Sequence, residues 1–218
     1  MSNVYPLRLL LIVFMMIHFS GVSQYKKEYW DSRDQWQKTP ELIKLMGLKK
    51  DMKVADVGCH EGYMTIHLSD FLSNKGKVYA VDVVESRINK LKKFIKEDKR
   101  TNVIPIVGKY DDPLLPKNIL DAVIIMDTYH EIDAYNKVLK KVYKSLKKGG
   151  KILILEEIKT YRIKDSRSSQ TSRHDIALRY VKKDLKKAGF TIEKEIPDFG
   201  RWENKEEEQM WILVAKKE

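Results

Sequence analysis

The sequence predicts an α/β protein built on a doubly wound, mostly parallel sheet of seven strands that ends in an antiparallel hairpin. Residues 53–63 read KVADVGCHEGY, an apolar strand that stops at an acid and enters a turn with two glycines. Downstream, short apolar runs alternate with amphipathic segments, as in sheets that helices cover on both faces. Two strand-like segments, 190–196 and 210–217, close the chain with only a short acidic connection, so they must pair as a hairpin.

The first 23 residues differ in composition from the rest. Arg8 precedes an apolar core at residues 9–17, and small residues follow up to Ser23. This core is shorter than the roughly 20 residues that a membrane-spanning helix needs. We therefore expect a secretory signal peptide at residues 1–23 and one domain over residues 24–218. The alternatives are an uncleaved N-terminal anchor and a misassigned start codon.

The leader predicts an exported protein, either periplasmic or membrane-associated, whereas a chain without it would be cytoplasmic. The lone Cys59 is compatible with both locations, because it cannot form an intramolecular disulfide. It lies in the glycine turn, where a small residue is needed, so we interpret it as structural.

The turn after the first strand indicates a ligand site. Gly58 and Gly62 tolerate positive φ and let the backbone approach a ligand. The next helix then directs its free N–H groups towards that ligand. The following strand ends at Asp82, where a doubly wound sheet binds ribose hydroxyls. The G-x-G-x-x-G pattern of dinucleotide sites is absent, so no pyrophosphate site is expected.

The remaining elements follow from apolar periodicity. Before the glycine turn we expect a short helix with Thr39 as N-cap and Pro40 at its first position. Helical stripes and buried strands are then predicted in turn. The helices carry Met64, Leu68 and Phe71; Ile88, Leu91 and Ile95; Ile132 to Leu146, ended by Gly149 and Gly150; and Ala177 to Ala188, ended by Gly189. The strands cover residues 103–107, 122–126 and 152–155, and the polar residues 159–173 are expected to form a mobile loop.

The acid-x-Gly-x-x-x-Gly turn, the strand-end Asp82 and the terminal hairpin together resemble class I S-adenosylmethionine-dependent methyltransferases. The resemblance covers most of the chain after Tyr29 and is closest to the broad group that contains the quinone-biosynthesis C-methyltransferases. It implies a Rossmann-like fold, S-adenosylmethionine as cofactor, and a small or lipophilic acceptor. Acceptor identity does not follow from cofactor motifs.

The same resemblance implies roles for individual residues. Asp56 would face the amino end of the cofactor through water, and the backbone from Gly58 to Gly62 would lie against its methionyl part. Asp82 would accept both ribose hydroxyls, as an acceptor-only carboxylate can. Val83 would lie against the adenine.

At two further positions the sequence departs from the family pattern. Residues 108–121 match the third family motif in length, and Asp111 is our choice for the adenine amine, with Asp112 close behind. Lys109 stands where many relatives have an acid, and an Asp-Asp-Pro turn is a compatible structural interpretation. His60 replaces a glycine common in the family, and it could touch the cofactor or point to solvent.

The cluster DTYHEID at residues 127–133 follows the fourth strand and should face the transferred methyl group. His130 is the candidate general base, since imidazole titrates near neutrality. Capping of the next helix or a bond to the backbone is an equally weighted structural role. His174 is a second cleft candidate, with Asp175 expected to cap the final helix. No metal site is predicted.

An Arg-x-x-Trp-Gln segment, Arg33 to Gln37, is similar to a lead-in of small-molecule methyltransferases that lies over the cofactor as a lid. Trp30 is expected to pack on the core.

The formal net charge of +11 could attract nucleic acid or an anionic membrane surface. The lysines are spread over several predicted helices without interleaved aromatic residues, which makes nucleic acid an unfavoured partner and leaves peripheral membrane contact open. The rival functions are an RNA or protein methyltransferase and a non-catalytic S-adenosylmethionine-binding module. The Asn-Pro-Pro-Tyr signature of adenine amino-group methylation is absent.

Overall fold

The computed structural model describes residues 27–218, so the predicted leader lies outside the described residues. One sheet holds seven strands in the order β3-β2-β1-β4-β5-β7-β6. The strands are β1 (Lys53–Val57), β2 (Lys77–Asp82), β3 (Val103–Val107), β4 (Leu120–Met126), β5 (Leu146–Lys159), β6 (Thr191–Arg201) and β7 (Glu208–Lys216). The first five are parallel, and β7 runs antiparallel between β5 and β6. The predicted fold class, including its terminal hairpin, is confirmed.

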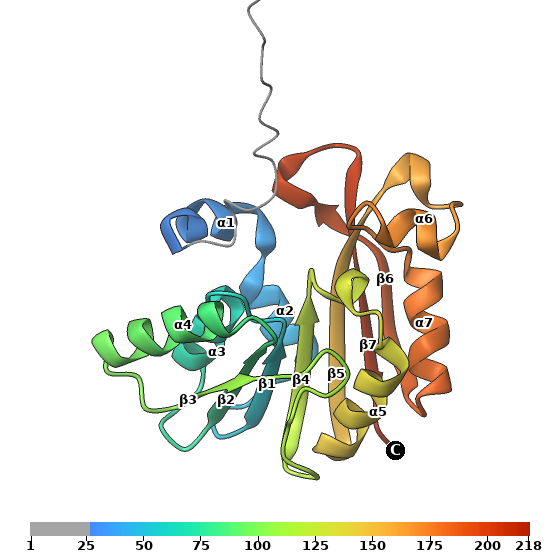
Figure 1. The fold of residues 1–218 in the computed structure, drawn as a ribbon. Coiled ribbons are helices and arrows are strands. Elements are labelled where there is room, and N and C mark those ends of the chain that lie inside the picture. The colour runs from blue at the N-terminus through green and yellow to red at the C-terminus, as the bar shows by residue number, and fades with distance from the viewer. Residues whose placement is uncertain (1–26) are drawn as a thin grey trace, which may run out of the picture.

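Helices cover both faces of the sheet (Figure 1). Helices α2, α3 and α4 pack on one face, and α5 and α7 on the other. The α-helices are α1 (Trp30–Gln37), α2 (Thr39–Met46), α3 (Tyr63–Phe71), α4 (Glu85–Glu97), α5 (Tyr135–Ser145), α6 (Arg167–Thr171) and α7 (Leu178–Lys187). No helix among residues 27–218 is long and apolar enough to cross a membrane.

Strand alternation divides the buried residues into two cores. In β1, Val54 joins the core beneath α3 and α4, whereas Ala55 joins the core beneath α5 and α7. The predicted stripe residues Leu68, Ile88 and Leu91 are all fully buried. Each central strand is thus covered on both faces, which explains why its sequence is continuously apolar.

Several segments lie above the carboxyl ends of the parallel strands, at the top of Figure 1. They are α1, α6 and the connection between β6 and β7. Within that connection, Trp202 packs against Trp36 of α1 with ring centroids 4.6 Å apart and the ring planes inclined at 60°. Ligands of open α/β sheets bind at this end.

The predicted boundaries of α2 and α5 are wrong. Lys38, at φ +54°, is the N-cap of α2, and Thr39 is already helical and bonds Tyr63 Oη at 3.0 Å. Helix α5 begins at Tyr135 and ends at Ser145, because β5 begins at Leu146. Gly149 lies within that strand, where its N–H donates to the carbonyl of Lys217. Apolar periodicity did not distinguish the last helical turn from the start of the strand.

Residues 159–173, expected to be a mobile loop, are folded. The segment contains the 3₁₀ turn Thr160–Arg162 and helix α6. The guanidinium of Arg162 is buried and donates to Asp175 at 2.9 Å. Asp175 therefore does not cap α7, whose N-cap is Ala177. Arg162, which belongs to a segment that the sequence predicts to be a mobile loop, is thus buried and stabilises the fold of that segment.

Candidate functional site

The glycine turn after β1 is tightly enclosed. Gly58 and Gly62 have φ of +84° and +103°. A Cβ on Gly58 would lie 2.2 Å from Cγ2 of Thr128, and one on Gly62 would lie 2.6 Å from Cδ1 of Leu91. Both positions therefore require glycine for conformation and for space.

Asp82 joins this turn to the end of β2. Its Oδ2 accepts from the backbone N–H of His60 at 2.9 Å, and its Oδ1 accepts from that of Val84 at 2.8 Å. The carboxylate is buried, with Arg87 3.5 Å away. Val83 beside it is 37% exposed. The structure thus brings the predicted ribose and adenine residues to the edge of the glycine turn.

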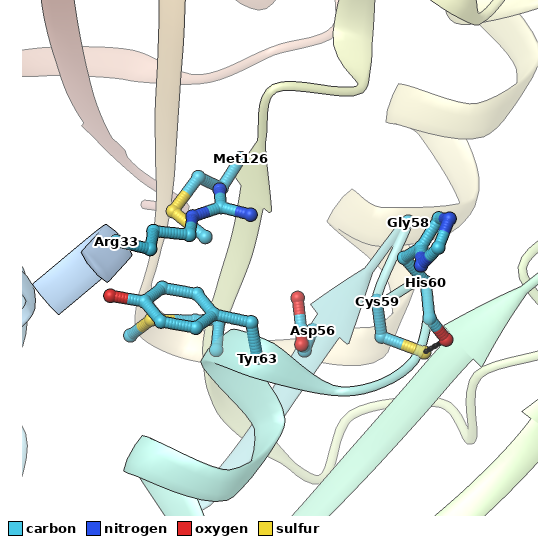
Figure 2. Close-up of a pocket in the computed structure, with 8 residues that line it drawn as sticks. Arg33, Asp56, Gly58, Cys59, His60, Tyr63 and Met126 are labelled. Atoms are coloured by element: carbon cyan, nitrogen blue, oxygen red, sulfur yellow. Dashed lines mark hydrogen bonds between the residues drawn. The ribbon is translucent and has the colours of Figure 1, made fainter. Parts of the chain in front are cut away.

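A pocket opens beside the turn (Figure 2). Figure 2 shows Asp56 between the turn on one side and the pair Arg33 and Tyr63 on the other. The lining residues are Arg33, Asp56, Gly58, Cys59, His60, Tyr63, Met64 and Met126. Burial raises the pKa of Asp56 to about 6, despite a hydrogen bond from Thr65 Oγ1 at 2.6 Å. The pocket therefore contains a carboxyl group that is costly to ionise in the protein alone.

Helix α1 closes this pocket. The guanidinium carbon of Arg33 lies 4.3 Å from the ring centroid of Tyr63, and its nitrogens donate to Gln37 Oε1 at 3.2 Å. Trp30 packs edge-on against Tyr63 and Phe94, so its predicted place on the core is confirmed. The lead-in segment thus supplies a buried cation to the pocket.

His60 has a left-handed backbone, with φ +50°, and lines the pocket. Burial lowers its pKa to about 4, with the nearby Arg87 acting in the same direction. The ring is consequently neutral at pH 7. The sequence left open whether His60 touches the cofactor or points to solvent. In the structure its side chain borders the pocket beside the glycine turn.

Asp111 lies elsewhere. Its carboxylate pairs with Lys137 at 3.2 Å, and that of Asp112 pairs with Lys141 at 2.5 Å. The backbone N–H of Leu114 donates to Asp112 Oδ1, which confirms the Asp-Asp-Pro turn. Asp111 is not among the residues lining the pocket beside the glycine turn. Its assignment to the adenine amine stays a prediction.

His130 lies in the 3₁₀ turn Tyr129–Glu131 after β4, and it is buried. Its Nδ1 bonds Glu156 Oε2 at 2.7 Å, and its Nε2 lies 3.4 Å from Glu131 Oε1. Burial alone would lower the pKa of His130, but the charge of Glu156 and the bonds to both glutamates raise it well above its usual value. These neighbours therefore favour the protonated ring over the neutral one. The structural alternative expected the His130 side chain to cap a helix or to bond a backbone group. Its ring instead contacts the carboxylates of Glu156 and Glu131.

Sequence reasoning missed Glu156. This fully buried side chain also accepts from the backbone N–H groups of Thr128 at 2.9 Å and Tyr129 at 2.5 Å. It therefore holds the whole turn after β4. The available signal was a pair of acids, Glu156 and Glu157, directly after the apolar run of a buried strand. His174, the second cleft candidate, bonds Glu131 Oε1 through Nδ1 at 2.5 Å.

Comparison with known proteins gives a family. A family model described as the ubiE/COQ5 methyltransferase family matches residues 30–171. The demethylmenaquinone methyltransferase of Geobacillus sp. (strain WCH70) is 31% identical over 116 residues, which are 53% of this chain and 50% of that protein. The chain spans about half the length of the curated relatives it matches.

Solved structures agree in fold. A SAM-dependent methyltransferase from Aquifex aeolicus is similar over 84% of this chain and 92% of its own, with a TM-score of 0.71 and 24% identity. Phosphoethanolamine N-methyltransferase 2 of Haemonchus contortus, solved with phosphomonomethylethanolamine and S-adenosylhomocysteine, covers 89% of this chain. That match covers 58% of the Haemonchus chain, with a TM-score of 0.68 and 16% identity. Because the family model covers well over half of the sequence and the fold agrees, this chain belongs to the ubiE/COQ5 methyltransferase family.

Proposed function

We propose that this protein is an S-adenosylmethionine-dependent methyltransferase whose acceptor is a small, lipophilic, quinone-like molecule. The observation that carries the proposal is the hydrogen bond that joins the glycine turn to the strand-end acid Asp82, next to the pocket. Family membership supports the reaction, and the demethylmenaquinone methyltransferases among the relatives support the acceptor class.

The donor set fits this cofactor. Its methionyl end carries an ammonium and a carboxylate, and the pocket offers Asp56 and Arg33 as partners of opposite charge. Each oxygen of Asp82 already accepts one backbone N–H, and a carboxylate oxygen retains a second lone-pair direction for a ribose hydroxyl. The exposed Val83 next to Asp82 offers an apolar surface for the adenine.

When bound, the cofactor supplies an electrophilic methyl group on a sulfonium. The chain's contribution is to hold the acceptor in line and away from water. His130 is our proposed catalytic residue, because it lies in the turn after β4, in which Thr128 Oγ1 bonds the carbonyl oxygen of Gly58 at 3.4 Å, although the His130 side chain does not itself line the pocket. Glu156 binds His130 Nδ1 and thereby fixes the orientation of the ring.

Binding and product formation test the proposal in two steps. Calorimetry on the full chain should detect S-adenosylhomocysteine and no NAD. Labelled cofactor added to a lipid extract containing demethylated quinones should then yield one labelled, extractable product. Binding of NAD and not of S-adenosylhomocysteine would contradict the proposal. Labelled RNA or protein, with no labelled small molecule, would show that the acceptor is a macromolecule.

Nucleic acid gains no support from the basic residues above the sheet. Arg162 pairs with Asp175, Arg167 with Asp184, and Arg179 donates to the carbonyl of Asp165 at 2.7 Å. These guanidinium groups stabilise the fold of the segment around α6.

We also propose that the chain is exported or tethered through residues 1–23. The support is the basic residue, apolar core and small residues of that segment. Mass spectrometry of the protein isolated from its own host should find an N-terminus near Gln24. An intact Met1 in a cytoplasmic fraction would contradict this proposal and leave the proposed reaction untouched.

A further inference from the structure

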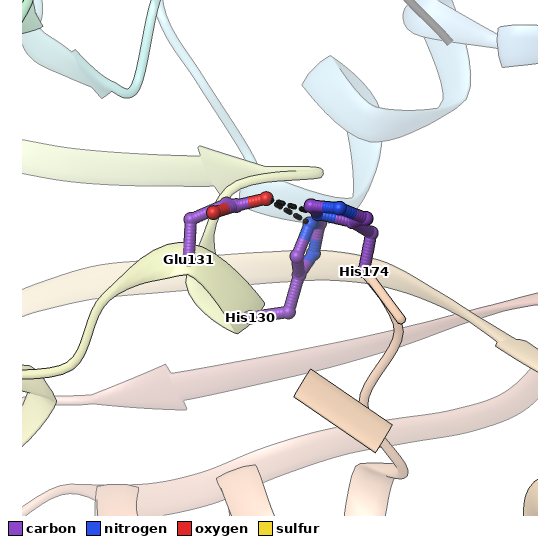
Figure 3. A group of neighbouring side chains, drawn as sticks. All are labelled: His130, Glu131 and His174. Carbon is purple, nitrogen blue, oxygen red and sulfur yellow. Dashed lines mark hydrogen bonds and ion pairs between the residues drawn. The ribbon is translucent and has the colours of Figure 1, made fainter. Parts of the chain in front are cut away.

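Two histidines and a glutamate converge above the sheet, outside the pocket beside the glycine turn. Figure 3 shows the rings of His130 and His174 directed at the carboxylate of Glu131. Glu131 Oε1 lies 3.4 Å from His130 Nε2 and 2.5 Å from His174 Nδ1. One ligand atom from each of the three residues lies within 4.8 Å of the others.

The orientation of His130 is fixed from behind. The buried carboxylate of Glu156 binds Nδ1 at 2.7 Å, so Nε2 is directed towards Glu131. Metal-binding histidines typically bond a carboxylate through their second ring nitrogen, which sets the tautomer and the ring orientation. The same buried carboxylate holds the backbone of the 3₁₀ turn that carries both His130 and Glu131.

His174 is brought to this turn by a folded segment. Gln170 is fully buried, donates to the carbonyl of Arg162 at 2.8 Å, and accepts from the N–H of Ala177 at 2.8 Å. Through these two bonds Gln170 holds the backbone before His174, at Arg162, and the backbone after it, at Ala177. Its side chain is 73% exposed, so its ring can still adjust its position.

The spacing fits a tetrahedral metal ion. Two bonds of about 2.0 to 2.1 Å at a tetrahedral angle separate their ligand atoms by about 3.3 Å. The separation of His130 Nε2 and Glu131 Oε1, 3.4 Å, is already close to this value. The 2.5 Å separation of His174 Nδ1 and Glu131 would have to lengthen, and the exposed ring permits this.

A second grouping, Asp127 with His130 and Glu156, is a weaker candidate. Glu156 is completely buried and already bonds His130 Nδ1 and three backbone N–H groups. Because Glu156 occupies Nδ1 of His130, the other ring nitrogen, Nε2, is the one that could bind a metal ion.

We propose that His130, Glu131 and His174 bind one divalent transition-metal ion of the zinc class. Two imidazole nitrogens and one carboxylate oxygen favour such an ion over Mg²⁺ or Ca²⁺, which prefer oxygen ligands. Three protein ligands leave a coordination position open, as in catalytic zinc sites. Binding displaces to solvent any proton on the two ligating nitrogens. Resting on the proposed function, the open position would hold an oxygen of the acceptor.

Metal binding is measured first without cofactor. The full chain is stripped with chelator and titrated with Zn²⁺ in a calorimeter, and Co²⁺ serves as a spectroscopic probe. We expect one ion per chain and visible Co²⁺ bands typical of four or five ligands. Mg²⁺ should not compete. Failure of both Zn²⁺ and Co²⁺ to bind the folded chain would overturn the proposal.

Variants locate the ion. His174→Ala and Glu131→Gln change exposed side chains, and each should weaken Zn²⁺ binding about 100-fold or more. His67→Ala is the matched control, because His67 also pairs with a carboxylate, that of Asp34 at 2.9 Å, and should bind Zn²⁺ normally. Equal binding by His174→Ala, Glu131→Gln and the parent would exclude this site. S-adenosylhomocysteine affinity, measured separately, tests the proposed function without affecting this result.

Discussion

The carboxylate of Asp82 accepts a hydrogen bond from the backbone N–H of His60 at 2.9 Å, so the acid at the end of β2 is bonded to the glycine turn after β1. A second bond, from the N–H of Val84, holds the other oxygen at the start of α4. The orientation of the carboxylate is thus set before any ligand binds. Pre-organisation of this kind reduces the entropy that binding would otherwise lose.

Replacing Asp82 should weaken cofactor binding. Asp82→Ala removes an ionised acceptor for ribose hydroxyls, so we expect a loss of about 1.5 to 3 kcal/mol in S-adenosylhomocysteine affinity by calorimetry. Asp198→Ala, an exposed acid on the edge strand β6, is the control and should bind normally. An affinity unchanged in Asp82→Ala would reject the ribose assignment. Circular dichroism checks that the turn has not unfolded.

Asp56 should make stability fall as pH rises. Its pKa is raised from 3.8 to about 6 by burial, so between these values the folded chain binds more protons than the unfolded chain. By linkage the free energy of unfolding decreases across this interval and levels off above pH 6. Asp56→Asn lacks the titration, so its stability relative to the parent should increase by up to ~3 kcal/mol between pH 4 and pH 7. Urea denaturation at several pH values measures the difference, and a constant difference would contradict the assignment.

Glu156 should be far more important to stability than its neighbour Glu157. Glu156→Ala leaves the buried His130 without its opposite charge and removes the acceptor of three backbone N–H groups, so we expect a loss of about 3 to 5 kcal/mol. Burial raises the pKa of Glu157 to about 9, which means that its side chain is neutral near pH 7. Glu157→Gln is therefore the matched control, expected within about 0.5 kcal/mol of the parent. Similar losses in both variants, measured by chemical denaturation, would reject the special role of Glu156.

Gly62 should show coupling to Leu91. Gly62→Ala introduces a Cβ 2.6 Å from Cδ1 of Leu91 at φ +103°, so it should destabilise by more than the roughly 1 to 2 kcal/mol of left-handed backbone strain. Leu91→Ala removes the clashing atom. In that background the added cost of Gly62→Ala should fall to the backbone value, which a double-mutant cycle measures. Strict additivity would show that the turn, and not α4, accommodates the methyl group.

The sequence predicted most of the sheet because local rules determine it. Strands covered on both faces must be continuously apolar, and the short connection before β7 permits only a hairpin. The glycine turn and Asp82 were found for the same reason, since conformation restricts what can stand at Gly58 and Gly62. These features depend on a few neighbouring residues.

The sequence predictions failed where residues far apart in the sequence determine the local structure. Residues 159–173 are polar, yet Arg162 and Gln170 are buried because Asp175 and backbone carbonyls satisfy them. Glu156 lies 26 residues after His130 and controls both its proton and its direction. No local pattern records such pairs. Helix α5 ended early for a related reason, because sheet pairing between Leu120 and Leu146 replaced the last helical turn.

Helix α1 also limits the distance between the site and any anchor. Arg33 of α1 lines the pocket, and only six residues, 24–29, lie between Ser23 and Trp30, the first residue of that helix. The seven Cα–Cα steps from Ser23 to Trp30 span about 25 Å at most. If residues 1–23 stay in a bilayer, Trp30, which packs against the pocket residue Tyr63, is held within that distance of the lipid surface. A lipophilic acceptor dissolved in the membrane would then travel less than the bilayer's own thickness to reach the enzyme.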